Sequence, residues 1–165
     1  YLFDQDEAKE AIYQCCNLAK VNNSKVALSL SDLFCVDRHR KDFLNLIDKY
    51  VDIIFANEHE IKSLYELDIK ESINKIIKTV DVGAITLGSR GSIVFNNKAE
   101  YHALPIDVGK PFDTTGAGDL FASGFLFGFI NNYSIEKCGN LGNKAASEII
   151  QYIGARPKTS LKSFL

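Results

Sequence analysis

The chain has 165 residues, of which 46% are hydrophobic and 24% charged, and its formal net charge is -2. This length and composition predict one globular domain with a substantial core. No basic face is evident, so nucleic acid is not an expected partner, and no apolar run is long enough to span a membrane. The four cysteines lack CxxC spacing, which argues against a zinc site and favours reduced thiols in a cytoplasmic protein.

The start of the chain does not look like the start of a natural protein. Methionine is absent from the sequence, and the residues Tyr1–Asp4 read like the end of a strand. No signal peptide pattern opens the chain. We therefore expect these residues to be a piece of a longer protein.

Helical spacing of apolar residues alternates with short apolar runs along the chain. Helices are predicted over Asp6–Lys20, Arg38–Tyr50, Asn57–Tyr65, Lys70–Val80, Leu120–Ile130 and Ile135–Ile153. Strands are predicted over Lys25–Leu30, Val51–Phe55, Val82–Leu87, Ser92–Phe95 and Ala99–Leu104, the last two forming a hairpin. Asp4 or Asp6 is expected to begin the first helix and Gly154 to end the last. The alternation predicts an α/β fold whose mostly parallel sheet is covered by helices on both faces.

The stretch Asp113–Asp119 leads directly into the apolar helix. Gly116 and Gly118 remove side chains where a phosphate would need the backbone, and the N-terminus of the helix offers unpaired N–H groups. Asp119 places a carboxylate beside this anion site, as expected of a base that takes a proton from an attacking hydroxyl. Each feature alone has a structural explanation as a cap or a turn. Their combination indicates phosphoryl transfer.

Two further stretches follow predicted strands. Asn57 with Glu60 has the form of a capping box, and a ligand role is the alternative because open α/β sheets bind ligands beyond the carboxyl ends of their strands. The sequence Gly88–Gly91 is either a plain turn or a place where the backbone approaches a nucleotide and Arg90 meets its phosphates. Because these stretches and Asp113–Asp119 all follow strands, we expect them to converge on one edge of the sheet.

Taken together, these motifs resemble the PfkB carbohydrate kinases, a family that includes ribokinase, adenosine kinase and fructokinase. The resemblance rests on Asp113–Asp119, Asn57–Glu60, Thr86–Gly91 and Gly154–Pro157, which stand in the family's order and spacing. It covers nearly the whole chain and implies a ribokinase-like three-layer sandwich with an inserted hairpin. It also implies ATP-dependent transfer of the γ-phosphoryl group to a hydroxyl of a sugar or nucleoside.

The resemblance assigns a role to each matching residue. Asp119 would be the base, and the N–H groups of Gly116, Ala117 and Gly118 would form the anion hole. The residues implied to bind ATP are Asn57, Thr86, Gly88, Ser89, Arg90, Gly91 and Asn143. Glu60 would hold Mg²⁺ through water. Asp113 and Thr115, with the loop at Gly154, would hold a monovalent cation such as K⁺.

Members of this family are considerably longer, and their N-terminal half supplies the acceptor-binding residues and a β-sheet lid. The resemblance therefore implies that residues 1–165 form the C-terminal, ATP-binding and catalytic part of a single kinase domain, poorly active alone. The stretches Tyr1–Asp4 and Ser29–Arg38 are most similar to bacterial adenosine-kinase-like sugar kinases. A homodimer is one expected assembly.

Three other functions fit parts of the sequence. A degenerate kinase domain that only binds nucleotide is one, although the intact Asp119 argues against it. A ribokinase-like kinase of a vitamin-type alcohol is another, and that branch usually lacks the Asn57–Glu60 pattern followed by this hairpin. A dinucleotide-binding oxidoreductase fits least, because no GxGxxG follows the first strand.

Overall fold

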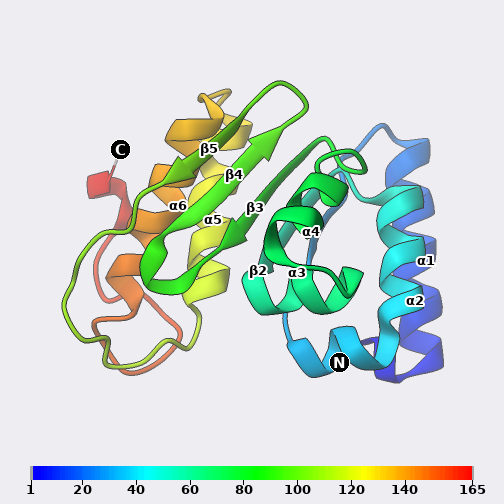
Figure 1. Ribbon diagram of the computed structural model, residues 1–165, viewed down its shortest axis with the longest axis horizontal. Helices are drawn as coiled ribbons and strands as arrows, with labels where there is room; N and C mark the ends of the chain where they lie inside the picture. Colours follow the sequence, from blue (N-terminus) through cyan, green and yellow to red (C-terminus); the bar gives the residue numbers. More distant parts are fainter. Residues whose placement is uncertain (1, 165) are drawn as a thin grey trace. The chain divides into compact units, whose positions relative to one another are not determined.

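The computed structural model describes residues 2–164. The chain divides into two compact units, one ending at Gly83 and the other beginning at Ala84, so that the boundary falls within strand β3 (Val82–Thr86) (Figure 1). Five strands form one sheet in the order β1-β2-β3-β4-β5. The predicted α/β fold, with a mostly parallel sheet and one hairpin, is confirmed.

The first unit packs helices around a parallel strand pair. Its elements are α1 (Asp6–Val21), β1 (Ala27–Ser29), α2 (Leu33–Tyr50), β2 (Ile53–Asn57), α3 (Glu58–Tyr65) and α4 (Ile69–Ile76). Strands β1 and β2 are parallel, with Ala27 opposite Ile53. The core forms because the apolar residues recur at the period of each element. Its most deeply buried side chains include Phe43, Leu46, Ile47, Ile54, Ile61, Leu64 and Ile76.

The start of α1 agrees with the prediction and that of α2 does not. Helix α1 begins at Asp6, one of the two expected starts, and its N-cap is Gln5. The Asp4 carboxylate instead lies 3.0 Å from Arg38 Nη2 and 2.7 Å from His39 Nε2. Helix α2 begins five residues before the predicted start at Arg38, because the Asp32 side chain accepts a hydrogen bond from the backbone N–H of Cys35.

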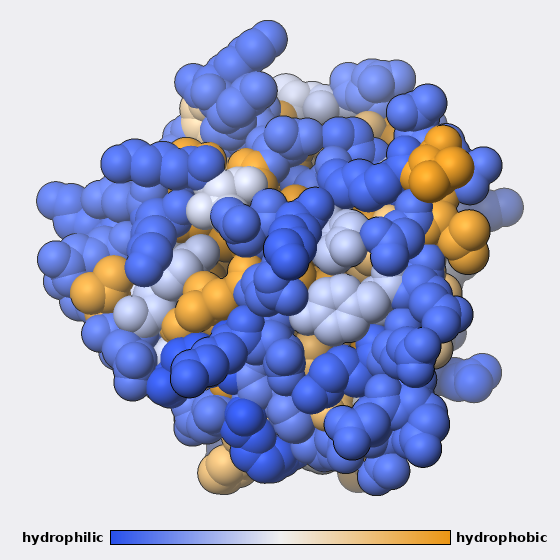
Figure 2. Space-filling model, turned by 90° about the vertical axis from the view of Figure 1, so that its right-hand side faces the viewer, coloured by the Kyte–Doolittle hydropathy of each residue, from blue (hydrophilic) through white to orange (hydrophobic). Residues whose placement is uncertain are grey.

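The surface drawn in Figure 2 is mainly hydrophilic, with hydrophobic residues in small separate groups. Exposed apolar side chains of the first unit include Leu18, Val21 and Phe34. Such scattered apolar residues are normal on the surface of a folded protein. No helix within residues 2–164 has the length and apolar character needed to cross a lipid bilayer.

The second unit places two helices against a hairpin. Its elements are β4 (Ser92–Asn96), β5 (Glu100–Ala103), α5 (Ala117–Ile130), α6 (Ile135–Ile149) and the short 3-10 helices η2 (Gly88–Arg90) and η3 (Leu161–Phe164). Strands β4 and β5 are antiparallel, with Ser92 opposite Ala103, and α6 packs on both. Figure 1 shows α5 and α6 on one face of this hairpin.

Glycines allow these elements to approach closely. A Cβ at Gly124 of α5 would come within 2.5 Å of the Leu141 carbonyl oxygen of α6. A Cβ at Gly139 of α6 would come within 2.9 Å of the Val94 methyl groups of β4. The backbones of α5 and α6 therefore pack directly against each other. This close packing fixes the start of α5 relative to the middle of α6. Helix α6 ends at Ile149 rather than at the predicted Ile153.

Candidate active site

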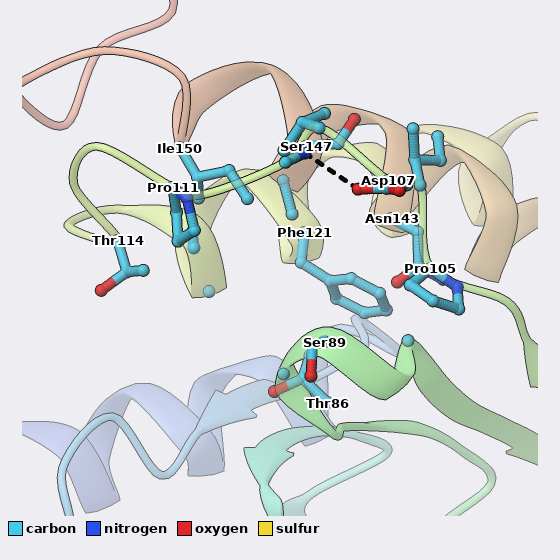
Figure 3. A pocket seen from close by; sticks show the side chains of 18 residues that line it. Thr86, Ser89, Pro105, Asp107, Pro111, Thr114, Phe121, Asn143, Ser147 and Ile150 are labelled. Atoms are coloured by element: carbon cyan, nitrogen blue, oxygen red, sulfur yellow. Dashed lines mark hydrogen bonds between the residues drawn. The ribbon is translucent and has the colours of Figure 1, made fainter.

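The second unit contains a cavity of about 580 Å³ (Figure 3). It is lined by residues that follow β3 and β5, by the start of α5 and by one side of α6. The lining residues are Thr86, Gly88, Ser89, Gly91, Pro105, Ile106, Asp107, Val108, Gly109, Pro111, Thr114, Ala117, Gly118, Phe121, Asn143, Ala146, Ser147 and Ile150. A cleft of this size with apolar walls and a few polar groups is typical of a small-molecule site.

The turn at Gly88–Gly91 forms one wall of the cavity. Gly88 and Gly91 have φ values of +61° and +84°, which favour glycine. A Cβ at Gly91 would lie only 2.2 Å from the Ala103 carbonyl oxygen, so the turn packs directly on the end of β5. His102 Nε2 lies 2.7 Å from the Arg90 carbonyl oxygen, and as the donor it fixes the turn further. Thr86, Gly88, Ser89 and Gly91 line the cavity, whereas Arg90 is exposed and is not among the lining residues. The ATP-binding role of these five residues stays a prediction.

Asn143 joins α6 to the opposite wall. Its Nδ2 donates to the carbonyl oxygens of Ala103 and Leu104, each at 2.9 Å. Its Oδ1 accepts a hydrogen bond from Ser92 Oγ at 3.1 Å. Because both amide hydrogens are used, Asn143 shapes the wall by fixing the chain that leaves β5. A role for it beside a nucleotide base stays a prediction.

The start of α5 lies open at one end of the cavity. Gly116, with φ +81°, precedes the helix, and no side chain caps it. Within residues 2–164 no acceptor binds the N–H groups of Gly118 and Asp119. Ala117 differs from the expected anion hole, because its N–H already donates to the Thr114 carbonyl oxygen at 3.1 Å. The open donors and the helix dipole both favour an anion here.

Asp119 lies in the first turn of α5, one residue after Gly118. Its side chain is exposed, and among the described residues no group donates a hydrogen bond to its carboxylate. An acceptor hydroxyl could therefore reach it without displacing a protein partner. Its role as the base stays a prediction.

Asp113 is held by three hydrogen bonds. Its Oδ1 accepts from the Thr115 hydroxyl at 2.6 Å and from the Thr115 N–H at 2.9 Å, while its Oδ2 accepts from the Gly154 N–H at 2.9 Å. These bonds, the Thr115 hydroxyl first, lower the pKa of Asp113 to about 2. The carboxylate therefore ties the motif to the loop after α6. Its part in binding a monovalent cation, with Thr115, stays a prediction.

We predict that Asp113→Asn weakens the fold at neutral pH and that the difference from the parent protein shrinks in acid. A lowered native pKa contributes stability that is fully present above the unfolded pKa of 3.8 and is lost as the pH falls through about 2. Urea unfolding of both proteins between pH 2 and pH 7 would measure this. A difference that stays constant over that range would contradict the prediction.

Asn57 and Glu60 lie in the first unit, where the predicted capping box is confirmed. Asn57 Oδ1 accepts from the N–H groups of His59 and Glu60, each at 2.9 Å. The Glu60 carboxylate accepts from the Asn57 N–H at 2.8 Å and from Asn57 Nδ2 at 2.7 Å. Burial raises the pKa of Glu60, and the bond from the Asn57 backbone opposes that rise. Both residues therefore have a structural role, and their nucleotide and Mg²⁺ roles stay predictions.

The sequence motifs did not identify every residue of the cavity. The sequence pattern predicts Phe121 only as part of an apolar helix, yet its ring lies among the lining residues in Figure 3 and a Cβ at Gly142 would contact it at 2.8 Å. Ala146, Ser147 and Ile150 also line the cavity. Their spacing from Asn143 at three, four and seven residues is the signal that could have found them. Among residues 2–164, no three His, Cys, Asp or Glu side chains gather as a metal site.

The sequence and the fold are similar to those of known proteins. The sequence model of the pfkB family carbohydrate kinases matches residues 3–161. A probable sugar kinase from Rhizobium etli CFN 42 is 44% identical, with a TM-score of 0.94 over 99% of this chain and 50% of its own. Adenosine kinase from Sinorhizobium meliloti is 40% identical, with a TM-score of 0.94 over 99% of this chain and 51% of its own. Ribokinase from Arabidopsis thaliana, complexed with ribose and ATP, is 25% identical, with a TM-score of 0.72 over 89% of this chain and 48% of its own.

The match therefore extends over nearly all of the chain but only about half of each of these relatives. The predicted ribokinase-like fold is confirmed by the structural agreement. The family match covers all the motifs from Asn57 to Pro157. The chain belongs to the pfkB family of carbohydrate kinases.

Proposed function

We propose that the protein transfers the γ-phosphoryl group of ATP to a hydroxyl of a sugar or nucleoside. One observation carries this proposal: the uncapped N-terminus of α5 lines the cavity. Gly118 lines the cavity, its N–H has no acceptor among the described residues, and the exposed Asp119 carboxylate follows it directly. An anion-binding N–H group and a carboxylate that can accept a proton thus lie next to each other at the end of one cavity. Phosphoryl transfer requires both groups.

The cavity supplies a place for the nucleotide. The side chains of Pro105, Pro111 and Phe121 offer apolar contact for the adenine of the nucleotide. The glycines of the turn Gly88–Gly91 let the backbone approach the nucleotide closely. The open N–H groups at the start of α5 would stabilise the charge on the transferred phosphoryl group. Asp119 would accept the proton of the attacking hydroxyl, which strengthens the oxygen as a nucleophile.

Two cations belong to the proposal. Both Glu60 oxygens accept hydrogen bonds from Asn57, so the carboxylate fits Mg²⁺ held through water better than direct binding. Mg²⁺ would supply charge that neutralises the ATP phosphates. Asp113 Oδ2 accepts one hydrogen bond and retains acceptor capacity, which fits the proposed monovalent cation site with Thr115.

The relatives support the proposed acceptor class. The proteins compared include an adenosine kinase and a ribokinase complexed with ribose and ATP, which points to a sugar or nucleoside for this protein too. We assign to residues 1–165 the C-terminal, ATP-binding and catalytic part of the kinase domain, and to the remainder of the full-length protein the acceptor site and lid. The four cysteines are free, and a reducing cytoplasm that supplies ATP is the proposed location.

The test is ADP release by the full-length protein, supplied with MgATP and a panel of sugars and nucleosides. Acceptor-dependent ADP formation would support the proposal, and the acceptor with the highest kcat/KM would identify the substrate. ATP binding without ADP formation for any acceptor would favour the non-catalytic nucleotide-binding alternative. Turnover confined to vitamin-type alcohols such as a hydroxymethylpyrimidine would favour the alternative of a ribokinase-like vitamin-alcohol kinase.

A further inference from the structure

A buried carboxylate that the proposed reaction does not use lies at the end of α6. Glu148 is 5% exposed. Its Oε1 accepts hydrogen bonds from the Thr159 hydroxyl at 2.8 Å and from the Thr159 N–H at 3.2 Å. Its Oε2 has no hydrogen-bond partner among residues 2–164. A buried carboxylate oxygen without a partner carries a large desolvation cost, so this side chain calls for an explanation.

Thr159 belongs to the segment 154–159, which follows α6 and runs back to the glycine turn before α5. The first residue of the segment, Gly154, donates its N–H to Asp113 Oδ2. The next residue lies against the turn itself, because a Cβ at Gly116 would come within 3.1 Å of both Ala155 Cα and Ala155 Cβ. The segment 154–159 therefore forms the support on which the turn at Gly116 rests.

Carboxylates hold this segment at both ends, Asp113 at Gly154 and Glu148 at Thr159. Beyond the segment, Leu161 of η3 packs on the apolar cluster of Leu120, Ala145 and Ile149. That cluster joins α5 to α6, so the support is tied to the helix whose N-terminus receives the phosphate. Asp113 belongs to the predicted phosphate-binding stretch Asp113–Asp119, whereas Glu148 lies far from that stretch in the sequence.

We propose that Glu148 is a positioning residue for phosphoryl transfer. Through Thr159 it holds the segment 154–159 against Gly116 and so fixes the direction of the open N–H groups at the start of α5. This inference rests on the proposed function. Loss of the link at Thr159 leaves the segment held at Gly154 and, beyond its other end, by the packing of Leu161, so that Ala155 and the residues after it can shift against the turn. A displacement of about 1 Å in groups that stabilise a transition state can lower turnover about 100-fold.

The kinetic test uses the full-length protein and four variants. Glu148→Ala should lower kcat by about 10- to 100-fold with a smaller change in the KM for ATP. Thr159→Val removes one of the two hydrogen bonds and should lower kcat less. Glu148→Gln keeps an acceptor for Thr159 and should retain most of kcat. Glu136→Gln, an exposed change on the same helix, is the matched control and should have no effect.

A second readout does not depend on activity. Amide hydrogen exchange in peptides covering 113–119 and 150–160 should be faster in Glu148→Ala and Thr159→Val, but not in Glu136→Gln. Unchanged exchange at 113–119 in both variants would overturn the inference, as would wild-type kcat in folded Glu148→Ala or an equal loss of kcat in Glu148→Gln. If the parent protein shows no phosphoryl transfer, the proposed function fails, and exchange at 113–119 alone then decides whether Glu148 holds the turn.

Discussion

Replacing Asp119 with asparagine should leave ATP binding nearly unchanged and reduce phosphoryl transfer by about 10²- to 10⁴-fold, the usual contribution of a general base. Asparagine has the size of aspartate but cannot accept the proton of the attacking hydroxyl. The side chain is exposed and receives no hydrogen bond from the described residues, so its replacement breaks no link within them. The expected loss is therefore one of chemistry rather than of folding.

Two measurements on the full-length protein separate these effects. A coupled assay of ADP release gives kcat, and calorimetric titration gives the affinity for ATP. Asp48→Asn, an exposed change on α2, is the matched control because it removes the same charge far along the chain from the motif. Turnover close to that of the parent protein in Asp119→Asn would rule out the base assignment. A large loss of ATP affinity would show instead that the carboxylate supports binding.

Helices and strands could be predicted where one face of the element is apolar. The predicted boundaries are wrong where a contact with a residue outside the element decides where it begins or ends. Helix α2 has non-helical angles at His39, close to where the apolar pattern placed its start. The preceding turns form because Asp32 caps them, and the run Leu33–Val36 fits a strand or a helix equally well. Helix α6 stops early because the Ile150 carbonyl oxygen accepts a hydrogen bond from the Phe112 N–H and the Gly154 N–H donates to Asp113 Oδ2.

The predicted strand Lys25–Leu30 was similarly too long. The register with β2 covers Ala27–Ser29, and Val26 and Leu30 each share one backbone hydrogen bond with β2. Ala27 and Ser29 are exposed although the run is mostly apolar. An apolar run does not reveal how much of its surface its neighbours cover, because burial depends on elements that arrive later in the chain.

The site could be predicted as far as its glycines and acids form local patterns. The turn at Gly88–Gly91 and the motif Asp113–Asp119 each require particular residue types at fixed spacing, and both contribute to the cavity. Phe121 and Ser147 carry no such pattern, since their place in the wall depends on how closely α5 and α6 pack. Glu148 shows the same limit, because its partner Thr159 is identified only by the path of the loop. Whether Asn57 shares an edge with these residues stays a prediction.

Gly118→Ala should separate the needs of the fold from those of the ligand. A Cβ at Gly118 would meet no atom within 4 Å, and its φ is not in the left-handed region, so the protein itself does not require glycine there. Alanine at a compatible position stabilises a protein by about 0.4–1 kcal/mol. If the space is kept for a phosphate, the same methyl group should lower phosphoryl transfer at least about tenfold, because it would hold the phosphoryl group away from the N–H donors that stabilise the transition state.

Gly116→Ala provides the contrast, since that glycine serves the fold. Its φ of +81° would cost an alanine about 1–2 kcal/mol, and the new Cβ would press on Ala155 at 3.1 Å. Gly116→Ala should therefore lower both the urea concentration at the midpoint of unfolding and the rate of ADP release. Gly118→Ala should lower only the rate of ADP release. If Gly118→Ala keeps the turnover of the parent protein, the open space at the start of α5 does not receive the transferred phosphate, and the anion seat must lie elsewhere in the cavity.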